Sequence, residues 1–227
     1  MKRNKTLRAA CRAEVIKLIV IALLFSLSTV SFSQSKDAGA ILEKTTHKYN
    51  EYTGGMEIGF TANLRSVKNN INESFEGTLT MKENKFALNT PDVKNWFNGT
   101  TLWTYMVNIQ EVNVSNPSGN ELQSINPLLF LRNYKKDFNV SYIGESTSHN
   151  NKMAYDIVMT PKKKDDVEKI ELQIEKSTSL PSRIVMLMKN DIRNSIIIKE
   201  IKSVDLSDTK FSFPEKDFPD VELVDLR

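Results

Sequence analysis

Apolar residues change their spacing along the chain, and the change separates one helix from a long run of strands. In residues 37–55 the less polar side chains recur at three- and four-residue intervals, at Ile41, Leu42, Thr45, Tyr49 and Tyr52. This spacing predicts an amphipathic helix. Asp37 is a suitable N-cap for it, and the pair Gly54-Gly55 favours a stop.

From Met56 onward apolar and polar residues alternate, which predicts half-buried antiparallel strands. Residues 56–65 and 75–82 form the first two expected strands, with a turn at 68–70 between them. Eight further alternating segments follow at hairpin spacing: 85–89, 101–108, 110–115, 137–144, 152–160, 167–176, 182–189 and 195–205. The sequence contains neither a βαβ rhythm nor a repeat of fixed period.

One apolar segment, residues 124–131, interrupts this alternation. Asn126 is expected to cap a short helix here, with Pro127 at its first position. Three basic residues come at or beyond the expected end of the helix, where the helix dipole favours them. They are Arg132, Lys135 and Lys136.

These elements predict a mainly β (α+β) fold. We expect a single strongly curved antiparallel sheet of about ten or eleven strands that forms an unclosed half-barrel, because a sheet this large tends to curl. The N-terminal helix and the short mid-chain helix would cover its apolar face. Two helices are too few to fill that face completely, so we also expect a hollow between helices and sheet.

Both tryptophans of the chain lie in residues 95–106, NWFNGTTLWTYM. The Asn-Gly pair inside this segment predicts a tight type I′ turn. Strand alternation then places Leu102 and Met106 on the side of the hollow. Trp103 and Tyr105 would lie on the opposite side, under a crossing segment such as the C-terminal VELVDLR.

The first 33 residues form a segment of a different kind. Six basic residues occur before or at the start of an apolar run at 18–25, and small residues follow at Ser31 and Ser33. This order is typical of a secretory signal peptide, and the run is shorter than the roughly 20 apolar residues that a membrane span needs. We therefore expect residues 1–33 to be cleaved, and residues 34–227 to reach the periplasm as one domain.

Removing that segment changes the charge of the chain. It contains six of the 31 basic residues and one of the 28 acidic residues, which leaves 25 basic against 27 acidic. Such a balance lacks the electrostatic footprint of nucleic-acid binding. The only cysteine, Cys11, precedes the apolar run, so we expect no disulfide and no lipid anchor in the exported domain. Its stability must then come from its core.

The sequence shows no pattern that indicates catalysis. His47 lies in the expected helix and His149 in a polar turn, without a partner histidine at metal-ligand spacing. Neither a G-x-S-x-G motif nor a phosphate-binding glycine loop is present. We therefore expect a binding protein that is not an enzyme and that needs no cofactor and no metal. An envelope hydrolase that uses scattered carboxylates is the weakest alternative.

Methionine is the most informative apolar residue. Besides Met1 there are seven, all in expected strands: Met56, Met81, Met106, Met153, Met159, Met186 and Met188. Methionine side chains adapt to irregular space and to varied ligands. These residues either fill an ordinary core or line the hollow. A hollow lined by Met, Phe, Leu and Ile would suit acyl chains rather than a sugar or a nucleotide.

Several motifs together resemble one known family. They are FTANL at 60–64, GTLTMK at 77–82, NGTTLWTY at 98–105, INPLLFL at 125–131 and YDIVMTP at 155–161. The third block is the most specific, and the others are individually weak. In this combination, which spans nearly the whole expected mature chain, they resemble the periplasmic outer-membrane lipoprotein carriers of Gram-negative bacteria, the LolA-type family.

The resemblance implies a function as well as a fold. A hydrophobic cavity under helical lids would receive the acyl chains of lipoproteins that an inner-membrane ABC transporter releases. An outer-membrane acceptor would then take the lipoproteins from the carrier, which is expected to be a monomer. The alternative is a periplasmic half-barrel of the same type that binds a lipid or a peptide as a sensor or anchoring domain, without lipoprotein transfer.

We expect eleven apolar residues of the helices and strands to line the acyl-chain cavity. They are Ile41, Leu42, Phe60, Leu64, Leu79, Met81, Leu88, Leu102, Met106, Leu129 and Phe130.

The sequence departs from the family's pattern at one turn. Family members commonly carry an arginine just after the strand that corresponds to residues 77–82, and this arginine binds carbonyl groups of the lid helix. Glu83 takes its place in this chain. The closing latch is therefore expected to be absent, or to be made by Lys82 or Lys85.

Overall fold

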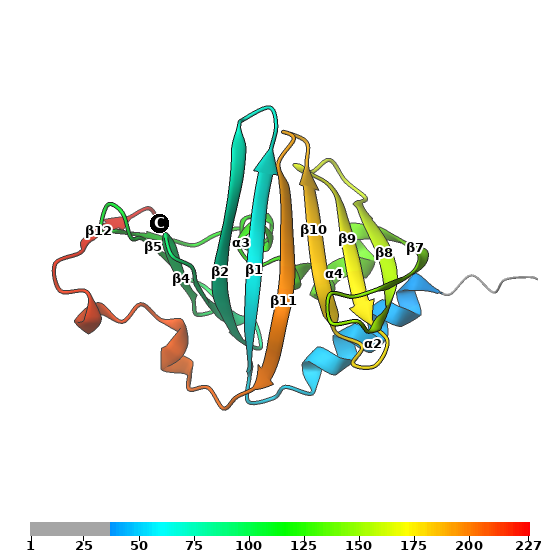
Figure 1. The fold of residues 1–227 in the computed structure, drawn as a ribbon. Coiled ribbons are helices and arrows are strands. Elements are labelled where there is room, and N and C mark those ends of the chain that lie inside the picture. Colours follow the sequence, from blue (N-terminus) through cyan, green and yellow to red (C-terminus); the bar gives the residue numbers. More distant parts are fainter. Residues whose placement is uncertain (1–36) are drawn as a thin grey trace, which may run out of the picture. The chain divides into compact units, whose positions relative to one another are not determined.

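The computed structural model describes residues 37–227, apart from the side chains of Asn120 and Ser124. The expected signal peptide, residues 1–33, lies outside the described residues. In the part described, strands form one unclosed, curved sheet with helices packed against one face (Figure 1). This arrangement confirms the predicted mainly β half-barrel.

The sheet has twelve strands rather than ten or eleven. They are β1 (Met56–Ser66), β2 (Ile71–Lys82), β3 (Lys85–Asn89), β4 (Val93–Phe97), β5 (Leu102–Met106), β6 (Glu111–Ser115), β7 (Phe138–Thr147), β8 (Met153–Pro161), β9 (Val167–Glu175), β10 (Pro181–Met188), β11 (Arg193–Ser203) and β12 (Glu222–Asp225). The α-helices are α2 (Ala38–Asn50), α3 (Gly119–Ile125) and α4 (Phe130–Asp137), and the short 3-10 helices are η1 (Pro127–Leu129), η2 (Asp208–Phe211) and η3 (Glu215–Asp217). The strands not expected from the sequence are β4 and β12.

The strand order is β12-β6-β5-β4-β3-β2-β1-β11-β10-β9-β8-β7. Strands β1 to β6 form one meander and β7 to β11 a second, and the antiparallel pair β1–β11 joins the two. In this pair Phe60 lies opposite Ile198 and Ala62 opposite Ile196, with a shift of register beside Gly59. The sheet is antiparallel except at one edge, where β12 pairs parallel with β6.

Helix α2 begins where the sequence predicts. The Asp37 side chain accepts a hydrogen bond from the backbone N–H of Gly39 at 2.8 Å, which caps the first turn. The helix ends at Asn50, and the glycine pair that follows turns the chain into β1. Gly55 has a φ of 117°, and a Cβ there would lie 2.9 Å from the carbonyl oxygen of Met81. Only glycine fits this conformation and this close approach.

Residues 119–137, which we call the lid segment, connect the two meanders. Asn126 caps η1 as predicted, because its Oδ1 accepts from the N–H of Leu128 at 3.1 Å and Pro127 is the first residue. The chain does not stop at residue 131, however, and continues as α4 to Asp137. The basic residues expected at or beyond the end lie inside this helix, because its buried face continues to Tyr134.

Helix α3, which begins the lid segment, was not predicted. It starts with a capping box in which Ser118 and Glu121 satisfy each other's backbone N–H groups. The S-x-x-E spacing of this box is a sequence signal for a helix start.

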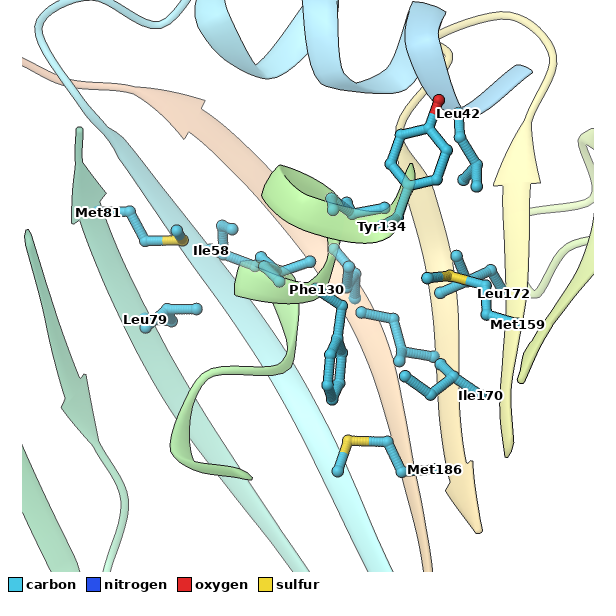
Figure 2. Close-up of a cluster of buried hydrophobic side chains, with 14 of the residues drawn as sticks. Leu42, Ile58, Leu79, Met81, Phe130, Tyr134, Met159, Ile170, Leu172 and Met186 are labelled. Carbon is cyan, nitrogen blue, oxygen red and sulfur yellow. The ribbon is translucent and has the colours of Figure 1, made fainter. Parts of the chain in front are cut away.

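The main core joins both helical elements to the sheet (Figure 2). Phe130 extends from the lid segment into the space between the strands, and its ring packs edge-on against Phe138 with the ring centroids 5.4 Å apart. Leu42 from α2 and Met159 and Ile170 from the sheet are fully buried in the same cluster. This core therefore fixes the lid segment and α2 over the second meander.

A second, smaller cluster lies on the other face of β4–β6 and is rich in aromatic residues. Trp103 and Tyr105 belong to it, whereas Leu102 belongs to the main core, as alternation predicted. The covering residues come from the chain just before β12: the Phe218 ring stacks edge-on with Tyr105 at 4.8 Å, and Phe213 joins them. Of the C-terminal VELVDLR, Val221 packs against this cluster, and residues 222–225 pair with β6 at the sheet edge.

The turn between β4 and β5 is not the expected type I′ turn. Four residues connect the strands, and Gly99 is the only one of them with a positive φ, at 104°. A type I′ turn needs positive φ at both central residues. The Asn98 side chain accepts instead from the N–H groups of Thr100 and Thr101, at 3.0 and 2.9 Å. This side-chain turn holds Asn98 out of the left-handed conformation.

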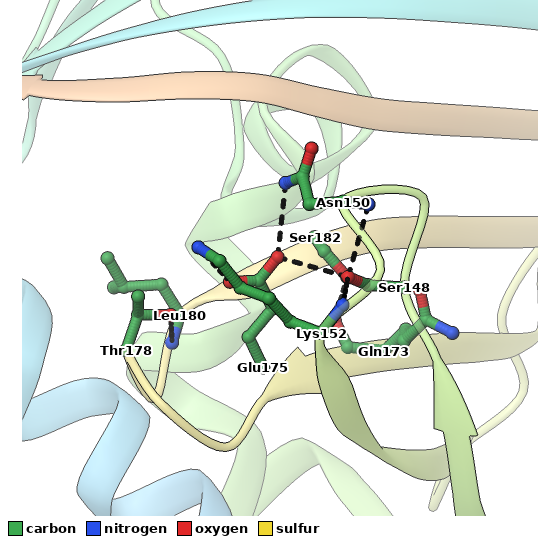
Figure 3. Close-up of polar contacts among 8 residues, drawn as sticks. All are labelled: Ser148, Asn150, Lys152, Gln173, Glu175, Thr178, Leu180 and Ser182. Atoms are coloured by element: carbon green, nitrogen blue, oxygen red, sulfur yellow. Dashed lines mark hydrogen bonds and ion pairs between the residues drawn. The ribbon is translucent and has the colours of Figure 1, made fainter.

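A buried carboxylate ties the β7–β8 turn to β9 (Figure 3). Glu175 is 4% exposed and accepts hydrogen bonds from Ser148 at 3.2 Å and from Asn150 at 3.1 Å. The Lys152 ammonium lies 3.2 Å from its other oxygen. Burial by itself raises the pKa of Glu175, but the hydrogen bonds and the charge of Lys152 outweigh it and hold the pKa below its ordinary value.

Candidate functional site

An apolar hollow of ≈ 270 Å³ lies between the first meander, the pair β10–β11 and the lid segment. Ile58 and Leu79, on neighbouring strands, are two of its lining residues and are visible in Figure 2. The other apolar lining residues are Phe60, Ala62, Phe75, Leu88, Val93, Ile125, Pro127, Leu128, Ile184, Ile196 and Ile198. The incomplete helical cover expected from the sequence thus leaves a hollow in the folded chain.

Isoleucine, and not methionine, dominates this lining. Within residues 37–227, five of the lining residues are isoleucines and none is a methionine. Met159 and Met186 are buried in the main core, and Met153 is 51% exposed. Met159 and Met186 therefore fill the core, which is the first of the two roles that the sequence left open for the methionines.

Among the side chains that the structure describes, three polar residues complete the lining and no charged residue does. Thr90 uses its hydroxyl within its own turn, where it donates to the carbonyl of Val93 at 2.7 Å and accepts from the N–H of the same residue. Asn95 accepts from the hydroxyl of Thr104 at 2.7 Å. The third polar residue is Asn194, whose Oδ1 is buried and has no hydrogen-bond partner in residues 37–227.

Polar contacts between α2 and the lid segment hold the cover in place. The hydroxyl of Tyr134 donates to the carbonyl of Gly39 at 3.1 Å, and the hydroxyl of Thr46 lies 3.4 Å from the carbonyl of Leu131. Lys135 and Glu43 form an ion pair across the two helices. Because this ion pair is exposed, it contributes little to stability, and the buried apolar contacts of Leu42 and Phe130 carry most of the packing.

Neither candidate lysine latches the lid segment. Lys82 donates to the carbonyl oxygen of Leu206 at 2.6 Å, and Lys85 pairs with Asp208 at 2.5 Å. Both partners lie in the chain that follows β11. These lysines therefore hold the C-terminal part of the chain against the β2–β3 turn, which corrects the expected lysine latch.

Glu83 and Arg132 face a small side pocket of ≈ 60 Å³ between the β2–β3 turn, α2 and the lid segment. Burial lowers the pKa of Arg132, and the negative charge of Glu83 opposes that shift. Glu83 of the β2–β3 turn thus supplies the acidic side chain of this pocket, and Arg132 of the lid segment supplies the basic one. Burial also raises the pKa of Tyr49, whose hydroxyl has no hydrogen-bond partner in the described chain.

The structure places the eleven predicted cavity residues in several environments. Phe60, Leu79 and Leu88 line the hollow. Met81 lines the side pocket. Leu42, Leu102 and Phe130 are buried in the main core, and Ile41 and Leu129 pack partly buried against it. Leu64 and Met106 are half-buried and lie outside both core clusters.

The β11 isoleucines were missed by sequence reasoning. Residues 196–198 are three consecutive isoleucines, so alternation does not say which of them face inward. The register with β1 decides this, because it sets Ile196 and Ile198 opposite Ala62 and Phe60.

The described chain offers no candidate for two other kinds of feature. Residues 37–227 contain no group of three or more His, Cys, Asp or Glu side chains that could hold a metal ion. None of the helices described is long and apolar enough to cross a membrane.

Several solved structures are similar to this one at low sequence identity. An uncharacterized conserved protein from Thermus thermophilus has a TM-score of 0.51 at 13% identity, covering 81% of this chain and 98% of that one. A LolA superfamily protein from Nitrosomonas europaea has a TM-score of 0.45 at 15% identity, covering 78% and 97%. A putative outer membrane lipoprotein-sorting protein domain from Vibrio parahaemolyticus has a TM-score of 0.42 at 9% identity, covering 78% and 97%.

Sequence comparison gives the family directly. No curated protein matches the chain. The family model for the outer membrane lipoprotein carrier protein LolA matches residues 27–190, which include β1 to β10 and the lid segment. The hollow is built largely from these residues. The chain belongs to the LolA family of outer membrane lipoprotein carrier proteins.

Proposed function

We propose that the protein is a periplasmic chaperone that binds the acyl chains of lipoproteins in the hollow and carries them from the inner to the outer membrane. The observation that supports this most directly is the lining, whose described residues are thirteen apolar and three polar ones, none of them charged, under the lid segment. Such a surface suits a hydrocarbon chain. Membership of the LolA family supports the same ligand class.

The driving force for loading would be the removal of hydrocarbon from water. Each methylene that enters the hollow gains about 0.8 kcal/mol. The step needs no bond to form or break, so the protein is proposed to act without enzymatic chemistry. Release to an acceptor would then require only that the acceptor bury the same chain at least as well.

The hollow is small for this cargo. Its volume of ≈ 270 Å³ lies just below the roughly 300–1,000 Å³ of ordinary small-molecule pockets. A lipid group with more than one chain would therefore have to displace the lid segment. Because Phe130 and Leu128 of that segment are buried against the sheet, loading would exchange protein contacts for contacts with the ligand.

Its proposed location follows from the sequence. A protein with a cleaved N-terminal signal would be released into the periplasm, between the ABC transporter that supplies lipoproteins and the acceptor that receives them. We expect osmotic shock of the producing cells to release the protein with Gln34 as its first residue. Recovery only from the cytoplasmic fraction, with the first 33 residues intact, would contradict this location.

Lipoprotein release from membranes tests the function itself. Inner-membrane vesicles that contain the releasing transporter and a labelled lipoprotein would be incubated with ATP and the purified protein. We expect the label to appear in the soluble fraction as a one-to-one complex. The matched control is the same lipoprotein without its acylated cysteine, which should form no such complex.

Two outcomes would count against the proposal in different ways. Label that stays with the vesicles, while a fluorescent acyl probe still binds the protein, would favour a lipid-binding sensor or anchoring domain. Failure of the acyl probe to bind at all would remove the hollow as a lipid site.

A further inference from the structure

Strand β11 presents a row of side chains to the hollow that changes from apolar to polar. Ile198, Ile196 and Asn194 all line it, at alternate positions of one strand face. The register places Asn194 between Leu64 of β1 and Met186 of β10. An acyl chain that lies along Ile198 and Ile196 therefore ends beside the carboxamide of Asn194.

Asn194 differs from the other polar lining residues in what its oxygen does. The hydroxyl of Thr90 and the carboxamide oxygen of Asn95 are both hydrogen-bonded within the described chain. The Oδ1 of Asn194 is buried and has no partner there. A buried acceptor left without a donor costs about 1–3 kcal/mol. A ligand that supplies a donor at this point would recover that cost.

The chemistry of the lining restricts what the ligand head can be. A free carboxylate would find no cation among the lining residues, and an unpaired buried charge is strongly unfavourable. An ester has no donor to offer to Asn194. An amide is uncharged and carries an N–H directly beside the carbonyl carbon that begins the acyl chain, so the donor and the hydrocarbon enter together.

We propose that Asn194 accepts a hydrogen bond from the N–H of an amide-linked acyl chain, and that the hollow thereby prefers N-acyl to ester-linked ligands. The hydrocarbon lies along Ile196 and Ile198, and the amide lies at the Asn194 end. This inference rests on the proposed function and specifies which linkage of the acyl group the site recognises.

A pair of matched probes tests the preference. N-methyldecanamide and methyl decanoate have the same chain and the same number of heavy atoms, and they differ in one N–H group. We expect the full-length protein to bind the amide roughly 5- to 150-fold more tightly than the ester, the equivalent of one recovered buried hydrogen bond. Calorimetry or displacement of a fluorescent acyl probe measures both affinities.

Two variants separate the role of Asn194 from that of its surroundings. Asn194→Leu should bring the ratio of the two affinities close to one while ester binding persists. Ser195→Ala alters the next residue of β11, which faces the other side of the strand and is not one of the lining residues, and it should leave the ratio as in the unaltered protein.

The outcomes distinguish this inference from the proposed function. Equal affinities for amide and ester in the unaltered protein would overturn the role of Asn194 without any variant, and acyl binding itself would stand. A ratio that survives Asn194→Leu would overturn it as well. If neither probe binds the unaltered protein, the result contradicts the proposed function itself and not only the role of Asn194.

Discussion

Replacing Leu79 with glutamate is expected to weaken acyl-chain binding strongly. Leu79 is 5% exposed and faces the hollow from β2, where no lining residue carries a charge. A carboxylate there has no partner and resists loss of its water, so a ligand chain loses the contact surface that Leu79 provides. A loss of about 2 kcal/mol corresponds to roughly 30-fold weaker binding of a fluorescent acyl probe, which a titration detects.

Controls must show that this effect is not unfolding. Ser74→Glu adds the same charge to an exposed position on the opposite face of β2 and should leave binding intact. Ala62→Leu fills part of the hollow without a charge; Ala62 is 3% exposed and lines it. This variant should weaken binding while the free energy of unfolding falls by no more than about 1–3 kcal/mol. Undiminished probe binding in both hollow variants would show that acyl chains bind elsewhere.

Replacing Glu175 with alanine is expected to lower the free energy of unfolding by about 3 kcal/mol at neutral pH. Glu175 accepts two hydrogen bonds and pairs with Lys152, and its side chain is 6% exposed. Buried hydrogen bonds to a charged group are worth about 1.5–3 kcal/mol each, but Lys152 is half exposed, so the ion pair adds little. Urea unfolding gives the difference.

Glu171 provides the matched control on the same strand. It also contacts two cations, Lys169 and Arg193, but its side chain is 34% exposed. Glu171→Ala should therefore cost less than about 1 kcal/mol. Equal losses in the two variants would mean that burial of Glu175 is not what makes its contacts strong.

The same carboxylate makes stability depend on pH. Its pKa in the folded protein is below the ordinary value of 4.5. Its stabilising contribution is therefore complete above that value and is lost as the pH falls through the depressed folded-state pKa. The difference in unfolding free energy between the unaltered protein and Glu175→Gln should accordingly shrink between pH 7 and about pH 3.

Local sequence signals predicted those elements whose caps or alternation can be recognised in their own residues. Asp37 and Asn126 cap their helices as expected, since a short polar side chain before an apolar stripe satisfies the free N–H groups of the first turn. Alternation placed Leu102 and Trp103 on opposite faces because the side-chain period of a strand is two.

Features that depend on tertiary contacts were not predictable in this way. Helix α4 continues to Asp137 because Tyr134, which follows Arg132, stays buried against α2. The parallel strand β12 requires β6 as its neighbour, and nothing in four residues specifies that partner. The same holds for Asn194, which lines the hollow only because β11 pairs with β1 in this register.

The pairing of β1 with β11 determines when the hollow forms during folding. Each meander forms from strands that are neighbours in sequence, but residues 59 and 200 must meet across most of the chain. Contacts of such long range form slowly, because closing the intervening chain costs entropy before the contacts are made. The hollow takes Phe60 and Ala62 from one side of this junction and Ile196 and Ile198 from the other, so it exists only after the junction has closed. By mass action, a ligand that binds only the closed sheet makes opening less favourable. The ligand-bound protein is then the more stable form, and the ligand-free protein is the form more exposed to proteolysis.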